Sequence, residues 1–224
     1  METLPPDPGP GPGIPARHGL LPPALRRDLT DLNSQFLDLS LASEASGAPD
    51  CRWAEPVWLR LRGVDRPTRT RMATAPFALF RLVPPALPAL APGTPSKGVA
   101  DLPLPAPVTG WQGRWVSFAH QAAFFARRLV DGAALAANVV LDLTPEAQSQ
   151  LSALCPSQLA TLAAQPGIVR PRWPDHLRFW EMLEAAARCD SAAAMQWAHC
   201  VGVCMLGIDA AGAAPGPGRR RPRR

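Results

Sequence analysis

Proline is the residue that most constrains how this chain can fold. The 224 residues include 28 prolines, of which eight lie in residues 1–24 and eight more in residues 84–110. Together with 17 glycines, this is far above average usage and indicates long irregular segments. Residues 1–24 cannot bury enough apolar surface to offset the entropy of ordering, so we expect them to be disordered. We expect residues 84–110 to form a semi-rigid, polyproline-like linker.

The rest of the chain carries helical patterns. We expect an N-terminal helical half in residues 25–83, a C-terminal helical half in residues 111–208 and a disordered, arginine-rich tail in residues 209–224. No two segments show convincing signs of a strand pair. The sequence therefore predicts an all-α fold.

Apolar residues recur at helical spacing in both halves. In the N-terminal half, the spacing predicts an amphipathic helix that buries Leu25, Leu29, Leu32, Phe36 and Leu39. A short helix is expected at residues 67–74. The C-terminal half opens with a helix that ends at Asp131 and Gly132 and whose apolar face holds Phe118, Ala122, Phe125 and Leu129.

The stretch LTPEAQSQLSALCPSQLATLAAQPGIVRPRWP, residues 143–174, predicts two short helices. Thr144 is a good N-cap with Pro145 at the first helical position, and Cys155-Pro156 ends one helix and begins the next. The pair has about the length of a helix-turn-helix, yet its second helix has no basic residue for reading base edges. We interpret it as a packed helical pair.

Two more helices are expected towards the C-terminus. Asp175 is expected to cap the first, which buries Leu177, Trp180 and Leu183. Asp190 is expected to cap the second, which ends at Gly207.

The two halves resemble each other weakly. Pro76 and Pro84 lie 90 residues before Pro166 and Pro174, and NSQFLDLSL, from Asn33, resembles QAAFFARRL 88 residues later. Each half runs from a long helix through a linker and a short helix to a proline and an apolar, basic segment. We expect a diverged tandem duplication, which would allow one half to pack on the other.

The net charge of +5 comes from the tail. The last six residues, RRRPRR, contain five arginines, and without them the chain has 18 basic and 18 acidic residues. The folded part is therefore neutral. The tail either binds nucleic acid or acidic surfaces without specificity or only solubilises the chain.

A second group of arginines lies within the N-terminal half, between Arg52 and Arg81, interleaved with tryptophan and phenylalanine. Arginine with aromatic residues suits phosphate contacts and base stacking. The alternative is a solvated amphipathic surface balanced by Glu55 and Asp65.

Signs of catalysis or metal binding are weak. An odd number of cysteines, five, argues against a complete disulfide framework and suits a reducing compartment. Cys200 and Cys204 lie one helical turn apart beside His199, but no set of four convergent ligands is present. We interpret these cysteines as buried apolar side chains, with redox pairing across a homodimer as the alternative. We expect no enzyme activity, no metal, no cofactor and no small-molecule substrate.

Nothing in the sequence indicates a membrane segment. METLPPDPGPGPG lacks the basic and apolar regions of a signal peptide, and VGVCMLGI is too short to span a bilayer. We expect a soluble, cytoplasmic protein that does not bind membranes.

One resemblance covers residues 115–206. Three segments carry it: AAFFARRLV, ALAANVVLDLTPEAQSQLSALCPSQLATLAAQPGIVRPRW and AAAMQWAHCVGVCML. Together they resemble the bacterial flagellar transcriptional activator subunit FlhD. That family is all-α, dimerises and acts with a partner subunit, FlhC, in a DNA-binding activator. The resemblance implies a cytoplasmic regulator that acts on DNA with a partner protein and can form a homodimer. Such a dimer needs an apolar, self-complementary surface, which the sequence does not identify.

Two functions follow as expectations. The first is a FlhD-like transcriptional regulator whose candidate DNA-binding residues are Arg60, Arg62, Arg66, Arg69, Arg71, Arg170 and Arg172. The second is a protein-interaction adaptor without direct DNA binding. Its candidate residues for a regulatory protein partner, either as buried anchors or as docking residues, are Trp111, Trp115, Trp173 and Trp180.

Overall fold

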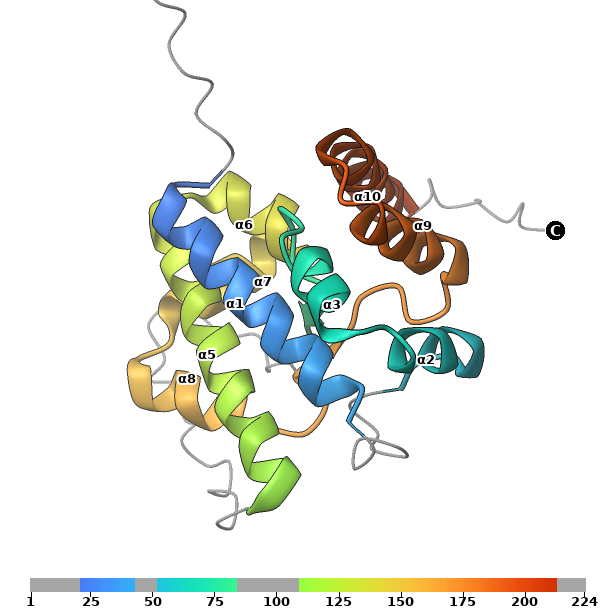
Figure 1. Ribbon diagram of the computed structural model, residues 1–224. Helices are drawn as coiled ribbons and strands as arrows, with labels where there is room; N and C mark the ends of the chain where they lie inside the picture. The colour runs from blue at the N-terminus through green and yellow to red at the C-terminus, as the bar shows by residue number, and fades with distance from the viewer. Residues whose placement is uncertain (1–20, 43–51, 84–108, 213–224) are drawn as a thin grey trace, which may run out of the picture.

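The structure is a computed structural model that describes residues 21–42, 52–83 and 109–212, with side chains up to Leu206. The described residues form nine helices and two strands (Figure 1): α1 (Pro23–Ser40), α2 (Glu55–Arg62), α3 (Arg66–Met72), β1 (Phe80–Leu82), α5 (Gly110–Gly132), α6 (Ala134–Leu141), α7 (Pro145–Ala153), α8 (Pro156–Ala163), β2 (Val169–Pro171), α9 (Leu177–Arg188) and α10 (Ala192–Gly212). The all-α prediction is confirmed in its main feature, since the described residues are mostly helical.

The expectation that no strands pair is wrong. β1 and β2 form a two-stranded antiparallel sheet in which Arg81 lies opposite Arg170 and Phe80 opposite Pro171. Hydrogen bonds from the amides of Val83 and Arg172 flank the ladder. In an antiparallel ladder, hydrogen-bonded and non-hydrogen-bonded residue pairs alternate. Phe80 and Pro171 form a non-hydrogen-bonded pair, so the missing N–H of Pro171 costs the sheet no hydrogen bond. The sequence shows little sign of this strand pairing because each strand has only three residues and its partner lies far along the chain.

α1 and α5 pack side by side (Figure 1). α7 and α8 cover α5, whereas α2 and α3 pack against α9. α10 packs mainly on α9, at the edge of the molecule away from α5. The segments before and after residues 84–108 therefore lie against each other through both helices and strands.

One hydrophobic core extends through both segments. Phe36 of α1 is fully buried. Its ring centroid lies 5.6 to 6.2 Å from those of Phe80, Trp115 and Phe118, and the Phe118 ring lies 5.2 to 5.7 Å from the other two. The predicted apolar faces of α1 and α5 lie in this core: Leu29 and Leu32 are buried with Phe36, as are Phe118, Ala122, Phe125 and Leu129. The predicted boundary between α7 and α8 at Cys155-Pro156 is also confirmed, and the side chain of Thr144 caps α7.

Several predicted boundaries and caps are wrong. Leu21 is buried and α1 begins at Pro23, so the predicted disordered segment extends too far. α10 continues to Gly212 rather than ending at Gly207. His176, not Asp175, precedes α9, and the hydroxyl of Ser191, not Asp190, accepts a hydrogen bond from the first turn of α10. The expectations for residues 1–20, 84–108 and 213–224 lie outside the described residues.

Several elements of the two segments begin about 90 residues apart. α2 and α7 begin 90 residues apart, as do α3 and α8, while β1 and β2 begin 89 residues apart. The two strands pair with each other, and the long helices α1 and α5 pack against each other.

Candidate functional site

Five of the predicted DNA-binding arginines lie on two adjoining helices, and three of these five are ion-paired within the chain. Arg69 pairs with Asp38 at 3.2 Å and Arg71 with Asp190 at 3.1 Å. Arg60 pairs with Glu184 of α9. These arginines are therefore already compensated by acidic residues and hold α2 and α3 against their neighbours.

Glu184 is the central residue of this ion network. Its carboxylate is buried and accepts hydrogen bonds from the Nε atoms of both Arg60 and Arg188. Arg188 also lies 3.7 Å from Asp65, the N-cap of α3. A buried carboxylate is stable only when cations or donors surround it, so the network connects α2, α3 and α9 structurally.

Arg172 does not lie on the surface, so its assignment to DNA is wrong. Its guanidinium is buried and donates to the backbone oxygens of Ala78 at 3.1 Å and Val140 at 3.0 Å. Asp142, in the left-handed conformation at the end of α6, lies 3.8 Å away. Arg172 thus connects the residues before β1, the end of α6 and β2.

The other predicted arginines are exposed. Arg62 lies over the ring of Trp58 at 4.8 Å, and Arg66 begins α3. Arg170 projects from the exposed side of the sheet directly opposite Arg81. Like charges directly opposite each other in a sheet are destabilising, which makes this pair suited to an anion.

Three of the four predicted partner-binding tryptophans are core residues. Trp115, Trp173 and Trp180 are buried, and the Trp180 indole donates to the backbone oxygen of Trp173 at 2.9 Å. Of the two roles expected for them, buried anchor and docking residue, burial agrees with the first and leaves a partner protein no access in the folded chain. Trp111 is half-buried; it stacks on Trp115 and donates to the backbone oxygen of Leu39.

A different tryptophan is exposed on α10. Trp197 is 67% exposed, and Val203, Cys200 and Cys204 are exposed on the same side of the helix. The prediction that these two cysteines are buried is wrong. We call the exposed residues Ala193, Gln196, Trp197, Cys200, Val203 and Cys204 the outer face of α10. No formal charge occurs from Ala192 to Ile208, so this face is apolar or weakly polar along its length.

The opposite face of α10 fixes the helix to the core. Ala198, Gly202 and Leu206 recur every four residues and are buried. Gly202 lies so close to the ring of Phe77 that a Cβ atom there would overlap it. His199 is half-buried beside the same ring, and burial lowers the pKa of its imidazole.

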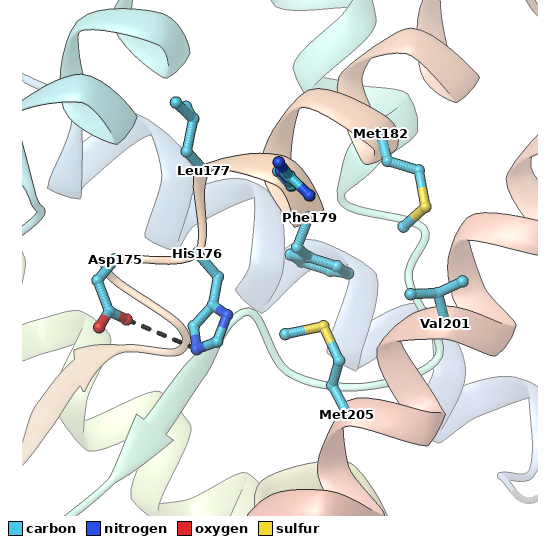
Figure 2. Close-up of a pocket in the computed structure, with 8 residues that line it drawn as sticks. Asp175, His176, Leu177, Phe179, Met182, Val201 and Met205 are labelled. Atoms are coloured by element: carbon cyan, nitrogen blue, oxygen red, sulfur yellow. Dashed lines mark ion pairs between the residues drawn. The ribbon is translucent and has the colours of Figure 1, made fainter.

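A groove of about 570 Å³ lies between α9 and α10, next to the outer face. Figure 2 shows Phe179, Met182, Val201 and Met205 converging on it from the two helices, with Asp175 and His176 at one end. Methionine side chains adapt to differently shaped apolar ligands, so the groove suits an apolar protein side chain. We call the groove and the outer face together the α9–α10 surface.

The chemistry of the remaining titratable groups is limited. Within the described residues, no cluster of three His, Cys, Asp or Glu side chains has the geometry of a metal site. The thiol of Cys155 is exposed, and hydrogen bonds from the hydroxyl of Ser157 and the amide of Gln158 lower its pKa. Among the described residues, the hydrogen bonds of Cys155 involve Ser157 and Gln158 and no histidine or carboxylate.

The sequence did contain a sign of the α9–α10 surface. The run from Ala192 to Ile208 has no formal charge, which is unusual for a helix with a solvated face. The interpretation of its cysteines as core residues left out the alternative, that the run has one face on the core and another that is exposed.

Comparison of the chain with protein-family models, with curated proteins and with solved structures found no match. Among the described helices, none combines the length and apolar character needed to cross a membrane.

Proposed function

We propose that this protein is a non-enzymatic helical interaction module that binds a protein partner through the α9–α10 surface. The observation that carries the proposal is the exposure of Trp197 on a helix without formal charge, beside an apolar groove. Exposed tryptophans next to apolar pockets are frequent sources of binding energy between proteins. An amphipathic helix laid into such a groove is a common mode of recognition.

The residues that line the α9–α10 groove support a role in binding rather than catalysis. The groove is lined by Phe179, Met182, Val201 and Met205, and its titratable residues, Asp175, His176 and Arg178, lie just before α9 and in its first turn. The arginines of α2 and α3 are engaged in ion pairs that fix the fold. The proposed site is therefore the α9–α10 surface with Trp197, and not the four tryptophans expected from the sequence or the ion-paired arginines.

The scaffold that presents this surface is, in our proposal, a diverged tandem duplication. Its support is the 90-residue spacing of α2 with α7 and of α3 with α8, and the pairing of β1 with β2. α9 and α10 follow the second unit and form the binding surface.

The experiment is quantitative affinity purification of the tagged full-length chain from its native cells. We compare wild type with Trp197→Ala and with Leu135→Ala, which removes a 75% exposed leucine from α6. The proposal expects a defined protein, identified by mass spectrometry, that is lost with Trp197→Ala and retained with Leu135→Ala. The same set of proteins in all three samples argues against the α9–α10 surface as a docking site.

A second candidate function is a regulator that contacts DNA together with a partner protein. It is favoured by the exposed pair Arg81 and Arg170, which lie opposite each other on the sheet, and by the exposed Arg62 and Arg66. A phosphate between the paired arginines would relieve their repulsion.

Anisotropy of a labelled random DNA duplex tests this second function. The full-length chain, a chain ending at residue 214 and the double variant Arg81→Ala/Arg170→Ala are compared at about 50 and 200 mM salt, because the salt dependence counts phosphate contacts. A steep salt dependence that survives removal of the tail and decreases in the double variant supports DNA binding by the folded part. Binding that disappears with the tail limits any DNA contact to the tail.

A further inference from the structure

We propose that a groove between α1 and α5 binds residues 12–20 of this chain, PGIPARHGL, and holds the guanidinium of Arg17 between Asp31 and Phe124. The inference goes beyond the proposed function, because this groove lies on a different pair of helices from the α9–α10 surface. We call it the α1–α5 groove.

The α1–α5 groove consists of two adjoining depressions of about 310 and 320 Å³. Its two walls run antiparallel: Arg128 of α5 pairs with Asp28 near the start of α1. At the other end, the indole of Trp111 donates to the backbone oxygen of Leu39. The part of α1 between Asp28 and Leu39 is about 16 Å long, which matches about five residues of extended chain.

The end of the groove near Asp31 suits an arginine side chain. Asp31 makes no side-chain hydrogen bond or ion pair with the described residues, whereas the cation beside it, Arg128, is already paired with Asp28. Phe124 lines the same depression from α5 and is 41% exposed. A guanidinium pairs with a carboxylate and stacks on an aromatic ring, and this depression offers both.

The middle of the groove suits an extended backbone. Gln35 and Gln121 line both depressions from opposite walls, and their side chains have no hydrogen-bond partner among the described residues. A side-chain amide both donates and accepts, so the two glutamines can bond to the backbone of a peptide that runs between them.

The length of the chain before α1 brings Arg17 to Asp31. Leu21 is buried, so it fixes the end of the segment at the start of α1, which begins at Pro23. Asp31 lies eight residues into α1, or about 12 Å along it. Arg17 lies four residues before Leu21, which is also about 12 Å of extended, proline-bearing chain. A segment that turns back along α1 therefore places the guanidinium beside the free carboxylate.

The two prolines of the segment favour the same path. On this scale Pro15 lies about 19 Å back from Leu21, and Gln35 lies about 18 Å along α1. A polyproline-like chain makes no internal hydrogen bonds, so its backbone oxygens are free to accept from Gln35 and Gln121. By itself this segment buries too little apolar surface to become ordered, and the groove supplies that surface.

Arg17 also has the shortest connection to the groove of the basic residues outside the described ranges. Lys97 lies twelve residues before Thr109, and the arginines from Arg219 onward follow α10, at the edge of the molecule away from α5 (Figure 1). A short tether gives a high effective concentration, so a weak contact suffices to fill the groove. Another arginine-bearing peptide then reaches the groove only by displacing this segment.

Trypsin cleavage of the full-length chain after Arg17 tests the proposal, because a guanidinium held in the groove cannot enter the protease. We compare wild type with Asp31→Asn and Phe124→Ser, which change exposed positions and should leave the fold intact. We expect each variant to raise the cleavage rate after Arg17 at least about five-fold, since each loses one contact to the guanidinium. Cleavage in the arginine-rich tail should keep its rate.

Two substitutions outside the groove serve as controls. Glu181→Gln removes the same charge from an exposed position of α9, and Leu135→Ser removes an exposed apolar side chain from α6. Both should be cleaved after Arg17 at the wild-type rate. A rate that is the same in wild type, Asp31→Asn and Phe124→Ser overturns the proposal.

A labelled peptide of residues 9–20 separates this segment from other occupants. Its fluorescence anisotropy is measured against full-length wild type, Arg17→Ala and Arg17→Ala/Asp31→Asn. We expect Arg17→Ala to bind the peptide at least about ten-fold more tightly than wild type, whose own segment competes, and the double variant to lose that gain. Equal affinity for wild type and Arg17→Ala overturns the segment as occupant. No binding to Arg17→Ala overturns the groove as its site.

Discussion

Single buried polar side chains determine how the irregular segments of this chain are held. Asn33 of α1 is fully buried; its amide donates to the backbone oxygens of Ala73 and Phe77, and its side-chain oxygen accepts from the amide of Leu79. One side chain therefore satisfies three backbone groups of the connection between α3 and β1. The sequence places Asn33 next to an apolar face, but nothing local to it indicates partners some 40 residues away.

Replacement of Asn33 by alanine should destabilise the protein by about 2–4 kcal/mol, because buried backbone groups lose their hydrogen bonds. Urea unfolding measures the change. The matched control is Asn138→Ala, since Asn138 is exposed and donates one hydrogen bond, to Leu143. The two variants should differ by at least about 1 kcal/mol; equal losses would contradict the role assigned to Asn33.

Asp65 should make stability depend on pH. Hydrogen bonds from the amide and then the hydroxyl of Thr68, together with the charge of Arg188, lower the pKa of Asp65. A lowered pKa means that the stabilisation is complete above the ordinary aspartate range, about 4, and is lost as the pH falls through the lowered value. Asp65→Ala should therefore lower the Tm at pH 7, and its difference from wild type should decrease towards pH 3.

Asp65→Asn is the control for this prediction. Asparagine keeps an oxygen for capping α3 but does not titrate, so its Tm should change less than that of wild type over the same pH range. A wild-type Tm that changes no more than that of Asp65→Asn over this range would contradict the prediction.

At the scale of elements, hydrophobic periodicity was a good guide to helices packed on one side. The spacing of leucine and phenylalanine identified α1 and α5 because each presents one face to the core. It failed for α10, which is apolar on more than one side: one face meets Phe77, and the outer face is exposed. Periodicity shows which side of a helix is apolar, but not what covers that side.

Gly202→Ala tests how closely α10 lies against the core. A Cβ at this position overlaps the ring of Phe77, which is fully buried. We expect a loss of about 1–3 kcal/mol in the free energy of unfolding, despite the higher helix propensity of alanine. Gly132→Ala, where a Cβ meets nothing within 4 Å, should be neutral or stabilising. Thermal unfolding compares them; a neutral Gly202→Ala would contradict this packing.

At the scale of the whole molecule, contacts between the segments before and after residues 84–108 hold the fold together. The segments share one core, a two-stranded sheet and the ion pairs of Glu184 with Arg60 and of Asp190 with Arg71. Arg172 adds a buried connection, since it donates to Ala78 in one segment and to Val140 in the other. An arginine that looks like a DNA contact in the sequence is therefore part of the interior.

Arg172→Ala should destabilise the protein by about 2–4 kcal/mol, because backbone oxygens lose a buried donor. Arg170→Ala, two residues away and exposed, should change stability by less than about 0.5 kcal/mol, or increase it by removing the repulsion from Arg81. Urea unfolding of both variants checks the contrast. Similar values for the two arginines would refute the division between interior and surface.

The sequence by itself determined the helical class, the apolar faces of α1 and α5, and the cap and boundary of α7 and α8, because these follow from interactions within a few residues. Only the tertiary structure decided that β1 pairs with β2, that Trp180 and Arg172 are buried, and that Trp197 and Cys200 are exposed. A side chain's type gives its preference for the interior or for water. Its actual surroundings depend on residues that are distant in the chain, and these are known only once the segments have packed.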